Sequence, residues 1–283
     1  MNNCIVKNQL PIGVFDSGMG GLTVLQELIN CLPKESYTYL GDTARVSYGI
    51  KSYNVVMHYA IQMASILIDQ GIKLLVVACS TVSAVALPFL QTQFPDTPMV
   101  GVVESGARET ANVTKNNRVA LLATETTIQS GIYQKIMLTL NPHIKINSQI
   151  CGLFVALAEE GCVNNEIATL VAKQYLKPIV NDRYPCDSVV LGCTHLPVFI
   201  NSLTEILGKD INIINAAKTT AEKTRSIIQK MHLENTNPYV HLNFLVTDSP
   251  GRFARIGKIF LGRSIDPMSV QLIDGTKINR LDQ

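Results

Sequence analysis

The sequence predicts an α/β protein of two domains, each with a mainly parallel sheet flanked by helices, and an active site in the cleft between them. Three observations support this prediction. Short β-branched apolar runs alternate with longer stretches of helical periodicity, which is the pattern of βαβ units. The chain has 283 residues, of which 47% are hydrophobic, enough for two cores. Two near-copies of one strand also end in a cysteine, at Cys79 and at Cys193.

Each predicted strand is a short apolar run bounded by turn or cap residues, as strands buried on both faces are. In chain order, these runs cover residues 11–16, 37–42, 74–79, 99–104, 119–124, 144–150, 188–193, 211–215 and 242–247. Apolar residues at helical spacing predict helices between them, among others over residues 22–32, 53–70, 131–138, 165–181 and 219–231. A single sheet of nine strands is an alternative, but we expect two sheets.

The expected domain boundaries lie near residues 101–106 and 215–219. They divide the chain into a first domain of residues 1–103 plus 217–283 and a second domain of residues 104–216. Each cysteine strand then belongs to its own domain. The two thiols would face each other across a cleft, and ligand sites favour such domain interfaces.

Composition excludes several classes of partner. The net charge is +2, only 16% of residues are charged, and the sequence has no block of five like charges, so we expect no nucleic-acid or membrane partner. The uncharged stretch over residues 74–94 contains Ser80, Thr81 and Pro88, which fits strand, turn and helix better than a membrane span. The expected partner is a small molecule.

Cysteine usage indicates a reducing compartment. Seven cysteines form no C-x-x-C pair, and residues 1–11 lack the charged and apolar regions of a secretory signal, so we expect a cytoplasmic protein. Cys193 and His195 alone do not make a zinc site, and no metal is expected. Five cysteines lack the context of the strand pair and are interpreted as packing or surface thiols: Cys4, Cys31, Cys151, Cys162 and Cys186.

The two strand cysteines are the first candidates for chemistry. An apolar run leads directly into Cys79 and another into Cys193, so each thiol is expected at the carboxyl end of a buried strand, where open α/β sheets bind ligands. Two matched acid–base groups suit a reaction in which a proton leaves one face of a carbon and returns to the other. The alternative is that both are inert buried cysteines.

The loop after the first strand, Phe15-Asp16-Ser17-Gly18-Met19-Gly20-Gly21-Leu22-Thr23, places a carboxylate, a hydroxyl and free backbone N–H groups at the same sheet edge. Such a loop can hold an anion. A dinucleotide fingerprint is a poorer interpretation, because Thr23 stands at its third glycine position and Asp16 would oppose a pyrophosphate. A tight turn without function remains open.

Two further segments carry candidate residues. Asp42 follows the second strand and is either part of a site or only a helix cap. His195 stands two residues after Cys193 and can tune the thiol, bind a carboxylate or move a proton. The pair Glu159-Glu160 can supply a carboxylate that orients this histidine, although paired acids on a helix usually face solvent.

Taken together, the motifs resemble glutamate racemase, of the aspartate/glutamate racemase superfamily, over residues 11–263. The segments that carry the resemblance are residues 12–24, Gly-Asp-Thr-Ala-Arg-Val-Ser-Tyr-Gly at 41–49, Ala-Cys-Ser-Thr at 78–81, residues 123–130, Ala-Glu-Glu-Gly at 158–161, Leu-Gly-Cys-Thr-His at 191–195 and residues 247–253. The resemblance implies two α/β domains, no cofactor, a homodimer, and the racemisation of glutamate to supply D-glutamate for peptidoglycan.

The resemblance also implies roles for individual residues. Cys79 would take the Cα proton from D-glutamate with help from Asp16, and Cys193 would take it from L-glutamate with help from His195 and Glu160. Asp42 corresponds to an acidic position implicated in the family. The residues implied to bind substrate are Asp16, Ser17, Tyr48, Gly49, Ser80, Thr81, Thr124, Thr127, Thr194 and His195.

The chain departs from the family pattern at four positions. Ser80 replaces the usual asparagine after the first catalytic cysteine, so a direct substrate contact is expected to become water-mediated. Ser47 replaces a proline and is expected to loosen its loop, and Gly152 and Ala156 also replace prolines. Two alternative functions stay open: racemisation of aspartate or another small acidic amino acid, and a regulatory protein that binds an amino acid without turnover.

Overall fold

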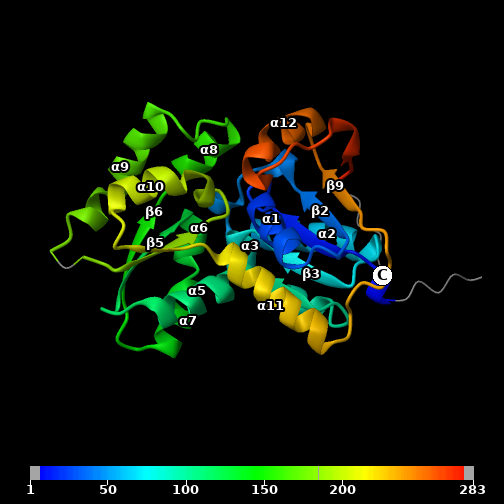
Figure 1. Cartoon of the computed structure of the whole chain (residues 1–283), viewed down its shortest axis with the longest axis horizontal. Coiled ribbons are helices and arrows are strands. Elements are labelled where there is room, and N and C mark those ends of the chain that lie inside the picture. The colour runs from blue at the N-terminus through cyan, green and yellow to red at the C-terminus, as the bar shows by residue number, and fades with distance from the viewer. Residues whose placement is uncertain (1–6, 184, 277–283) are drawn as a thin grey trace, which may run out of the picture.

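The computed structural model describes residues 7–183 and 185–276, which form two parallel sheets side by side (Figure 1). The six-stranded sheet has the order β10-β9-β2-β1-β3-β4 and the four-stranded sheet the order β6-β5-β7-β8. The strands of the first sheet are β1 (Ile12–Asp16), β2 (Tyr37–Gly41), β3 (Leu74–Val77), β4 (Met99–Gly101), β9 (Leu242–Val246) and β10 (Val270–Leu272). Those of the second are β5 (Arg118–Ala123), β6 (Lys145–Ile150), β7 (Ser188–Gly192) and β8 (Asn212–Ile214).

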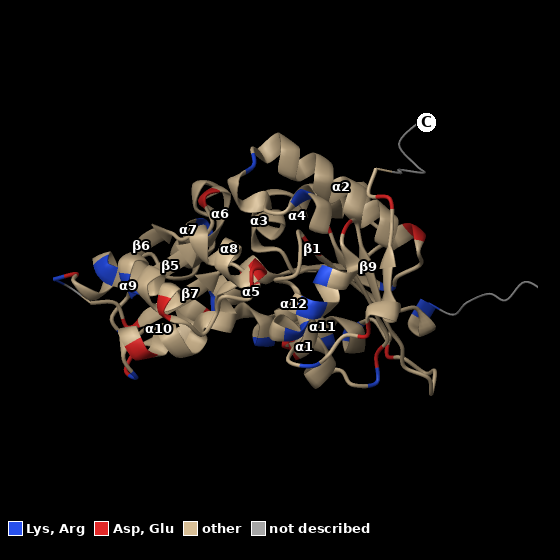
Figure 2. Ribbon diagram, turned by 90° about the horizontal axis from the view of Figure 1, so that it is seen from above, with Lys and Arg blue, Asp and Glu red and all other residues tan. Residues whose placement is uncertain are grey.

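Helices cover both faces of each sheet, and we call each sheet with its helices a lobe. In the first lobe, α2 packs on one face and α1 and α12 on the other (Figure 2). In the second, α5 and α7 lie on one side and α8, α9 and α10 on the other (Figure 1). The helices are α1 (Leu22–Cys31), α2 (Tyr53–Asp69), α3 (Ser80–Val85), α4 (Leu87–Gln93), α5 (Val102–Val113), α6 (Glu125–Gln129), α7 (Ile132–Leu140), α8 (Leu153–Glu159), α9 (Glu166–Val180), α10 (Ile200–Leu207), α11 (Ala216–Lys230) and α12 (Pro250–Leu261).

Strand β1 shows why the first sheet is apolar on both faces. Its side chains alternate, so Val14 belongs to the cluster that contains Leu25 of α1, whereas Phe15 belongs to the separate cluster that contains Val56 and Met63 of α2. Each of these five side chains is essentially inaccessible to solvent. The continuous apolar runs in the sequence therefore correspond to strands between two layers of helices.

The two-sheet α/β prediction is confirmed, and every predicted strand is present. The fourth strand is shorter than predicted, since it ends at Gly101 and α5 begins at Val102. The β-branched residues Val102 and Val103 continue the apolar run, but they are buried on the first turn of this helix instead. Strand β10 was not predicted, because only one of its three residues, Val270, is buried.

The lobes are joined by one continuous apolar core. Helix α11 packs against α1 of the first lobe and α5 of the second, and the larger core cluster contains residues of both sheets. The exact residue ranges of the two domains, and an open cleft between them, stay predictions. Within the described ranges, no helix combines the length and the apolar character needed to cross a membrane.

Candidate active site

Cys79 lies where β3 ends, as the residue that caps the N-terminus of α3. Its side chain is 4% exposed, and its Sγ lies 3.4 Å from Oγ of Ser17, in the loop after the neighbouring strand β1. Burial raises the pKa of the Cys79 thiol to about 12, and the charge of Asp16 adds to this. In this closed conformation Cys79 is therefore a thiol and can donate a proton.

Asp16 is the last residue of β1 and is fully buried. Its carboxylate accepts hydrogen bonds from the backbone N–H of Gly18, at 3.0 Å, and from Oγ1 of Thr194, at 3.4 Å. Burial raises the pKa of Asp16, and the charge of nearby His195 partly opposes this. A Cβ atom at Gly21 would lie 2.5 Å from Cβ of Asp16, so glycine is required where the chain turns beneath this carboxylate.

Cys193 stands in the same relation to the second sheet as Cys79 to the first, directly after β7. Its Sγ lies 3.8 Å from Nδ1 of His195, whose Nε2 lies 2.9 Å from Oε1 of Glu159. Burial lowers the pKa of His195, but its hydrogen bonds to Cys193 and Glu159 outweigh burial and raise that pKa to about 10. His195 is then an imidazolium at neutral pH, which stabilises a thiolate beside it.

The carboxylate beside His195 is that of Glu159, and the prediction that Glu160 assists this histidine is wrong. Glu160 is the residue after α8, its side chain is 70% exposed, and it pairs with Arg252 at 2.9 Å. The two neighbours point in different directions because successive residues at a helix end differ by about 100° around the axis. Only Glu159 faces the interior.

Three threonines join the lobes beside Cys79. Oγ1 of Thr81, on α3, lies 3.1 Å from Oγ1 of both Thr124 and Thr127 at the start of α6, and these two are 2.9 Å apart. All three are buried. A Cβ atom at Gly49 would lie 2.5 Å from Cβ of Thr124, so the loop that contains Gly49 also packs on this cluster.

The loop after β2 is held by Asp42, which is fully buried and does not cap the following turn with its side chain. Its carboxylate accepts hydrogen bonds from the hydroxyls of Tyr48 and Thr247, the latter at 2.8 Å. Arg45 pairs with it at 2.7 Å. Burial and the charge of Asp42 raise the pKa of Tyr48, so this hydroxyl stays protonated and donates. Asp42 thus positions the candidate substrate loop.

Ser47, in the same loop, does not simply remove a constraint. Its Oγ accepts a hydrogen bond from the backbone N–H of Gly49 at 3.1 Å, which replaces some of the restriction that a proline would impose.

Ser80 is the first residue of α3 and is 5% exposed. Its hydroxyl lies beside that of Tyr133, on α7, and opposes the rise in the pKa of Tyr133 that burial causes.

The predicted site residues therefore meet where the carboxyl ends of the two sheets face each other. Oγ1 of Thr194 contacts Asp16, Thr23 donates to the carbonyl oxygen of Thr194 at 3.3 Å, and a charge on Cys193 raises the pKa of Cys79. The same assembly includes both thiols, Ser17, Tyr48, Gly49 and Ser80. Glu160 lies outside it, paired with Arg252. Arg252, which binds Glu160, carried no predicted role; only its place in the motif at residues 247–253 marked it.

This arrangement is closed. Cys193 is 7% exposed, and a cavity of about 10 Å³ lined by residues of both lobes, among them Ser80 and Cys193, lies beside it. That volume holds about one water molecule, so the closed site has no room for an amino acid beside Cys193. Larger cavities are present, and the two largest of those described, of about 300 and 340 Å³, lie elsewhere.

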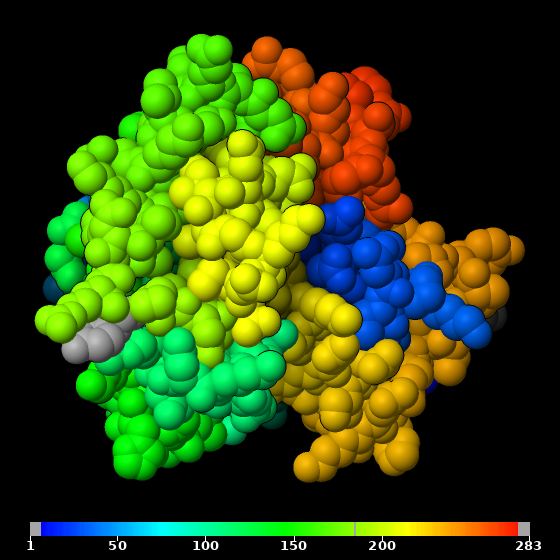
Figure 3. Space-filling view, turned by 60° about the vertical axis from the view of Figure 1, so that its left-hand side comes forward, coloured from blue at the N-terminus to red at the C-terminus, as the bar shows by residue number. Residues whose placement is uncertain are grey.

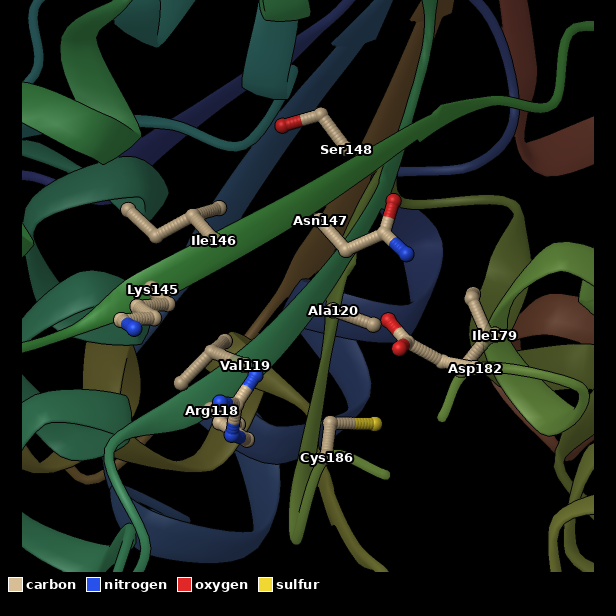
Figure 4. A pocket seen from close by; sticks show the side chains of 10 residues that line it. All are labelled: Arg118, Val119, Ala120, Lys145, Ile146, Asn147, Ser148, Ile179, Asp182 and Cys186. Carbon is tan, nitrogen blue, oxygen red and sulfur yellow. The ribbon is translucent and has the colours of Figure 1, made fainter. Parts of the chain in front are cut away.

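The first of these cavities lies at the end of the four-stranded sheet where β5 and β6 begin, away from the carboxyl ends of the strands. Side chains at the starts of β5 and β6, including Arg118 and Lys145, line one side of it, and Ile179 and Asp182 line the other (Figure 4). The second lies between α4 and α7. Neither contains a candidate catalytic thiol, so cavity size does not identify the site. No group of three or more His, Cys, Asp or Glu in residues 7–183 and 185–276 could hold a metal ion.

Comparison with known proteins identifies the family. The profile described as Asp/Glu/Hydantoin racemase matches residues 12–224. The chain belongs to this family. A glutamate racemase from Geobacter metallireducens is 44% identical over 252 residues, which cover 89% of this chain and 92% of the relative. The predicted resemblance to glutamate racemase is thereby confirmed, and the enzyme class is that of an isomerase acting on amino acids.

Solved racemase structures share the fold over almost the whole chain. The glutamate racemase of Francisella tularensis in complex with D-glutamate has a TM-score of 0.88 and 36% identity, and the match covers 95% of this chain and 99% of that one. The glutamate racemase of Thermus thermophilus in complex with β-chloro-D-alanine has a TM-score of 0.83 and 35% identity, with 94% and 98% covered. The racemase fold therefore includes both lobes of this chain.

Proposed function

We propose that the protein interconverts L- and D-glutamate without a cofactor, by proton transfer between Cα and the thiols of Cys79 and Cys193. The observation that carries this proposal is the placement of the two cysteines at the facing carboxyl ends of the two sheets, each with its own polar partners. The similarity to glutamate racemases over about nine tenths of the chain supports glutamate as the substrate.

The protonation state of Cys79 in the closed site suits the direction from L- to D-glutamate. Burial keeps Cys79 protonated, and the imidazolium of His195 lies 3.8 Å from Sγ of Cys193. Cys193 would take the Cα proton of L-glutamate and become a thiol. Cys79 would then give its own proton to the opposite face of Cα and become a thiolate, which is the state required for the reverse reaction.

The intermediate between these steps carries negative charge on Cα and on the α-carboxylate, and hydrogen-bond donors aimed at that carboxylate stabilise it. The candidates are the hydroxyls of Ser17, Thr81, Thr124, Thr127 and Thr194, with backbone N–H groups of the loop that contains Gly49. Thr81, Thr124 and Thr127 now donate to one another, and a substrate carboxylate would replace these mutual bonds. Because all three threonines are buried, the site must open for this exchange.

The remaining expectations belong to the same proposal. D-glutamate would serve peptidoglycan synthesis in the cytoplasm, the protein would act as a homodimer, and the open cleft would lie between domains of residues 1–103 plus 217–283 and 104–216. The similarity to glutamate racemases supports the first of these.

The deciding experiment incubates the purified protein with L-glutamate or L-aspartate in D₂O without an added cofactor and follows Cα deuterium and optical rotation together. Glutamate should racemise with incorporation of solvent deuterium, and activity should survive dialysis against a chelator. Preferred turnover of aspartate would replace the substrate. Binding of glutamate without deuterium exchange would instead indicate a regulatory protein.

A further inference from the structure

The machinery of Cys193 is assembled from both lobes. Cys193, His195 and Glu159 all belong to the second lobe, but two side chains of α12, in the first lobe, contact this group. Nη2 of Arg252 donates to the carbonyl oxygen of Glu159 at 2.7 Å, and the ring of Phe260 meets the ring of His195 edge to face at 5.4 Å. The surfaces of α8 and α12 adjoin at the top of the molecule (Figure 3).

The contact of Arg252 restrains the end of α8. The last carbonyl groups of a helix lack partners within it, and a cation there also interacts favourably with the helix dipole. Arg252 supplies a hydrogen-bond donor and a positive charge at Glu159, the residue whose side chain holds His195. Gly161, at φ +74°, reverses the chain immediately afterwards, and a Cβ atom there would lie 3.4 Å from Ile259 of α12. Helix α12 therefore packs directly on the turn that follows Glu159.

The ion pair between Arg252 and Glu160 does not explain this arrangement by itself. The two side chains are 40% and 70% exposed, and exposed ion pairs contribute little to stability. By contrast, the bond to the Glu159 carbonyl joins the exposed guanidinium to a residue whose carboxylate is 2.9 Å from Nε2 of the buried His195. A cavity of about 160 Å³ beside this bond is lined by Arg252 and Glu159, among others.

We propose that Arg252 is a positioning residue for one half of the racemisation: from the first lobe it holds Glu159 against His195, so that Cys193 has its proton-transfer partner only while the lobes are closed. This inference rests on the proposed two-thiol function. Arg252 touches neither thiol, and it acts through Glu159 and His195. Its loss should weaken proton removal from L-configured substrates and leave proton removal by Cys79 nearly unchanged.

Racemisation itself cannot show this asymmetry, because its equilibrium constant is unity and kcat/KM must be equal in both directions. An analogue with a β leaving group separates the halves. In β-chloroalanine the thiolate takes the Cα proton, the electron pair forms the Cα–Cβ double bond, and chloride leaves. Water then converts the aminoacrylate into pyruvate and ammonia, and pyruvate can be measured continuously.

The test compares Arg252→Met, Arg252→Lys and Arg255→Met with wild type on L- and D-β-chloroalanine. Arg255 is exposed on the same helix and serves as the matched control. For Arg252→Met we expect a loss of roughly ten- to hundredfold in kcat/KM with the L-analogue, as misplacement of a catalytic group predicts, and about twofold or less with the D-analogue. Arg252→Lys should recover part of the loss, and Arg255→Met should match wild type.

The pH profile supplies a second readout. In Arg252→Met, the alkaline limb of the pH–rate profile with the L-analogue should shift to lower pH than in wild type. The reason is that a poorly held Glu159 no longer keeps His195 charged. Equal losses with both analogues, or no loss, would overturn the inference. Failure of the two-thiol proposal is recognised separately, since Cys79→Ser and Cys193→Ser would then show no opposite preference for the two analogues.

Discussion

Glu159 and His195 form a buried pair, with Oε1 of Glu159 2.9 Å from Nε2 of His195, whereas the adjacent Glu160 points to the surface. The geometry of the other ring nitrogen follows from this pair, because a histidine held at Nε2 presents Nδ1 to Cys193. A single position in the chain thus separates a residue that tunes a thiol from one that binds a surface arginine.

Glu159→Gln should lower kcat for glutamate racemisation by roughly ten- to hundredfold, since it removes the charge that favours the imidazolium state of His195. Glu160→Gln is the matched control and should retain nearly full activity, because Arg252 keeps its bond to the Glu159 carbonyl. Initial rates followed by circular dichroism test both variants. Similar losses of activity in the two variants would show that the carboxylate of Glu159 has no particular role beside His195.

The buried pair of Glu159 and His195 makes the free energy of unfolding depend on pH. The folded-state pKa of His195 is raised from 6.5 to about 10, so its contribution to the free energy of unfolding is complete below pH 6.5 and is lost as the pH rises through about 10. Wild type should therefore lose stability relative to His195→Asn across this interval. Urea unfolding of both proteins at several pH values measures the difference. A constant difference would show that His195 is neutral in the folded protein.

Tyr133→Phe should leave the free energy of unfolding unchanged or slightly raised. The Tyr133 hydroxyl is fully buried and has no partner with hydrogen-bond geometry among the described residues, although Ser80 lies beside it. Removing an unpaired buried hydroxyl removes a desolvation cost. Tyr39→Phe is the control, since it loses a 2.9 Å bond to the carbonyl oxygen of Gly18 and should cost about 0.5–1.5 kcal/mol. A comparable loss in Tyr133→Phe would mean that Ser80 or a buried water pairs this hydroxyl.

Ser80→Asn should lower KM for glutamate by up to about tenfold with little change in kcat, if the shorter side chain costs one direct contact worth about 0.5–1.5 kcal/mol. The amide would also bring polar atoms to the unpaired hydroxyl of Tyr133. Steady-state kinetics in both directions measure the effect, with Ser80→Ala as control. An unchanged or higher KM would show that the surrounding side chains are already adapted to serine.

The strands and the two thiol positions could be predicted from the sequence because both depend on local patterns. An apolar run that ends in cysteine places the thiol at a strand end whatever lies around it, and Cys79 and Cys193 follow β3 and β7 as expected. The choice between Glu159 and Glu160 could not be made, since it depends on which face of α8 meets His195. The role of Arg252 was equally hidden, because its contact with Glu159 spans 93 positions.

The short strand β10 and the early end of β4 were missed for two different reasons. Val270–Leu272 joins the sheet as an edge strand next to β9, and an edge strand needs little apolar character. At β4 the β-branched run continues past Gly101, but the side chains of Val102 and Val103 enter the core from a helix. Burial alone does not distinguish a strand from the first turn of a buried helix.

Substitution of each cysteine tests the mechanism most directly, because it separates two one-sided bases from one shared base. Cys79→Ser and Cys193→Ser should each abolish racemisation of glutamate, since a serine hydroxyl is too weakly acidic to exchange a proton with Cα at neutral pH. Each variant retains one thiol and should still deprotonate one enantiomer of β-chloroalanine: Cys79→Ser the L-form, through Cys193, and Cys193→Ser the D-form, through Cys79. Pyruvate release with each enantiomer measures this preference, which must reverse between the variants. The same preference in both, or near wild-type racemisation by either, would mean that the paired cysteines serve packing and that another group moves the proton.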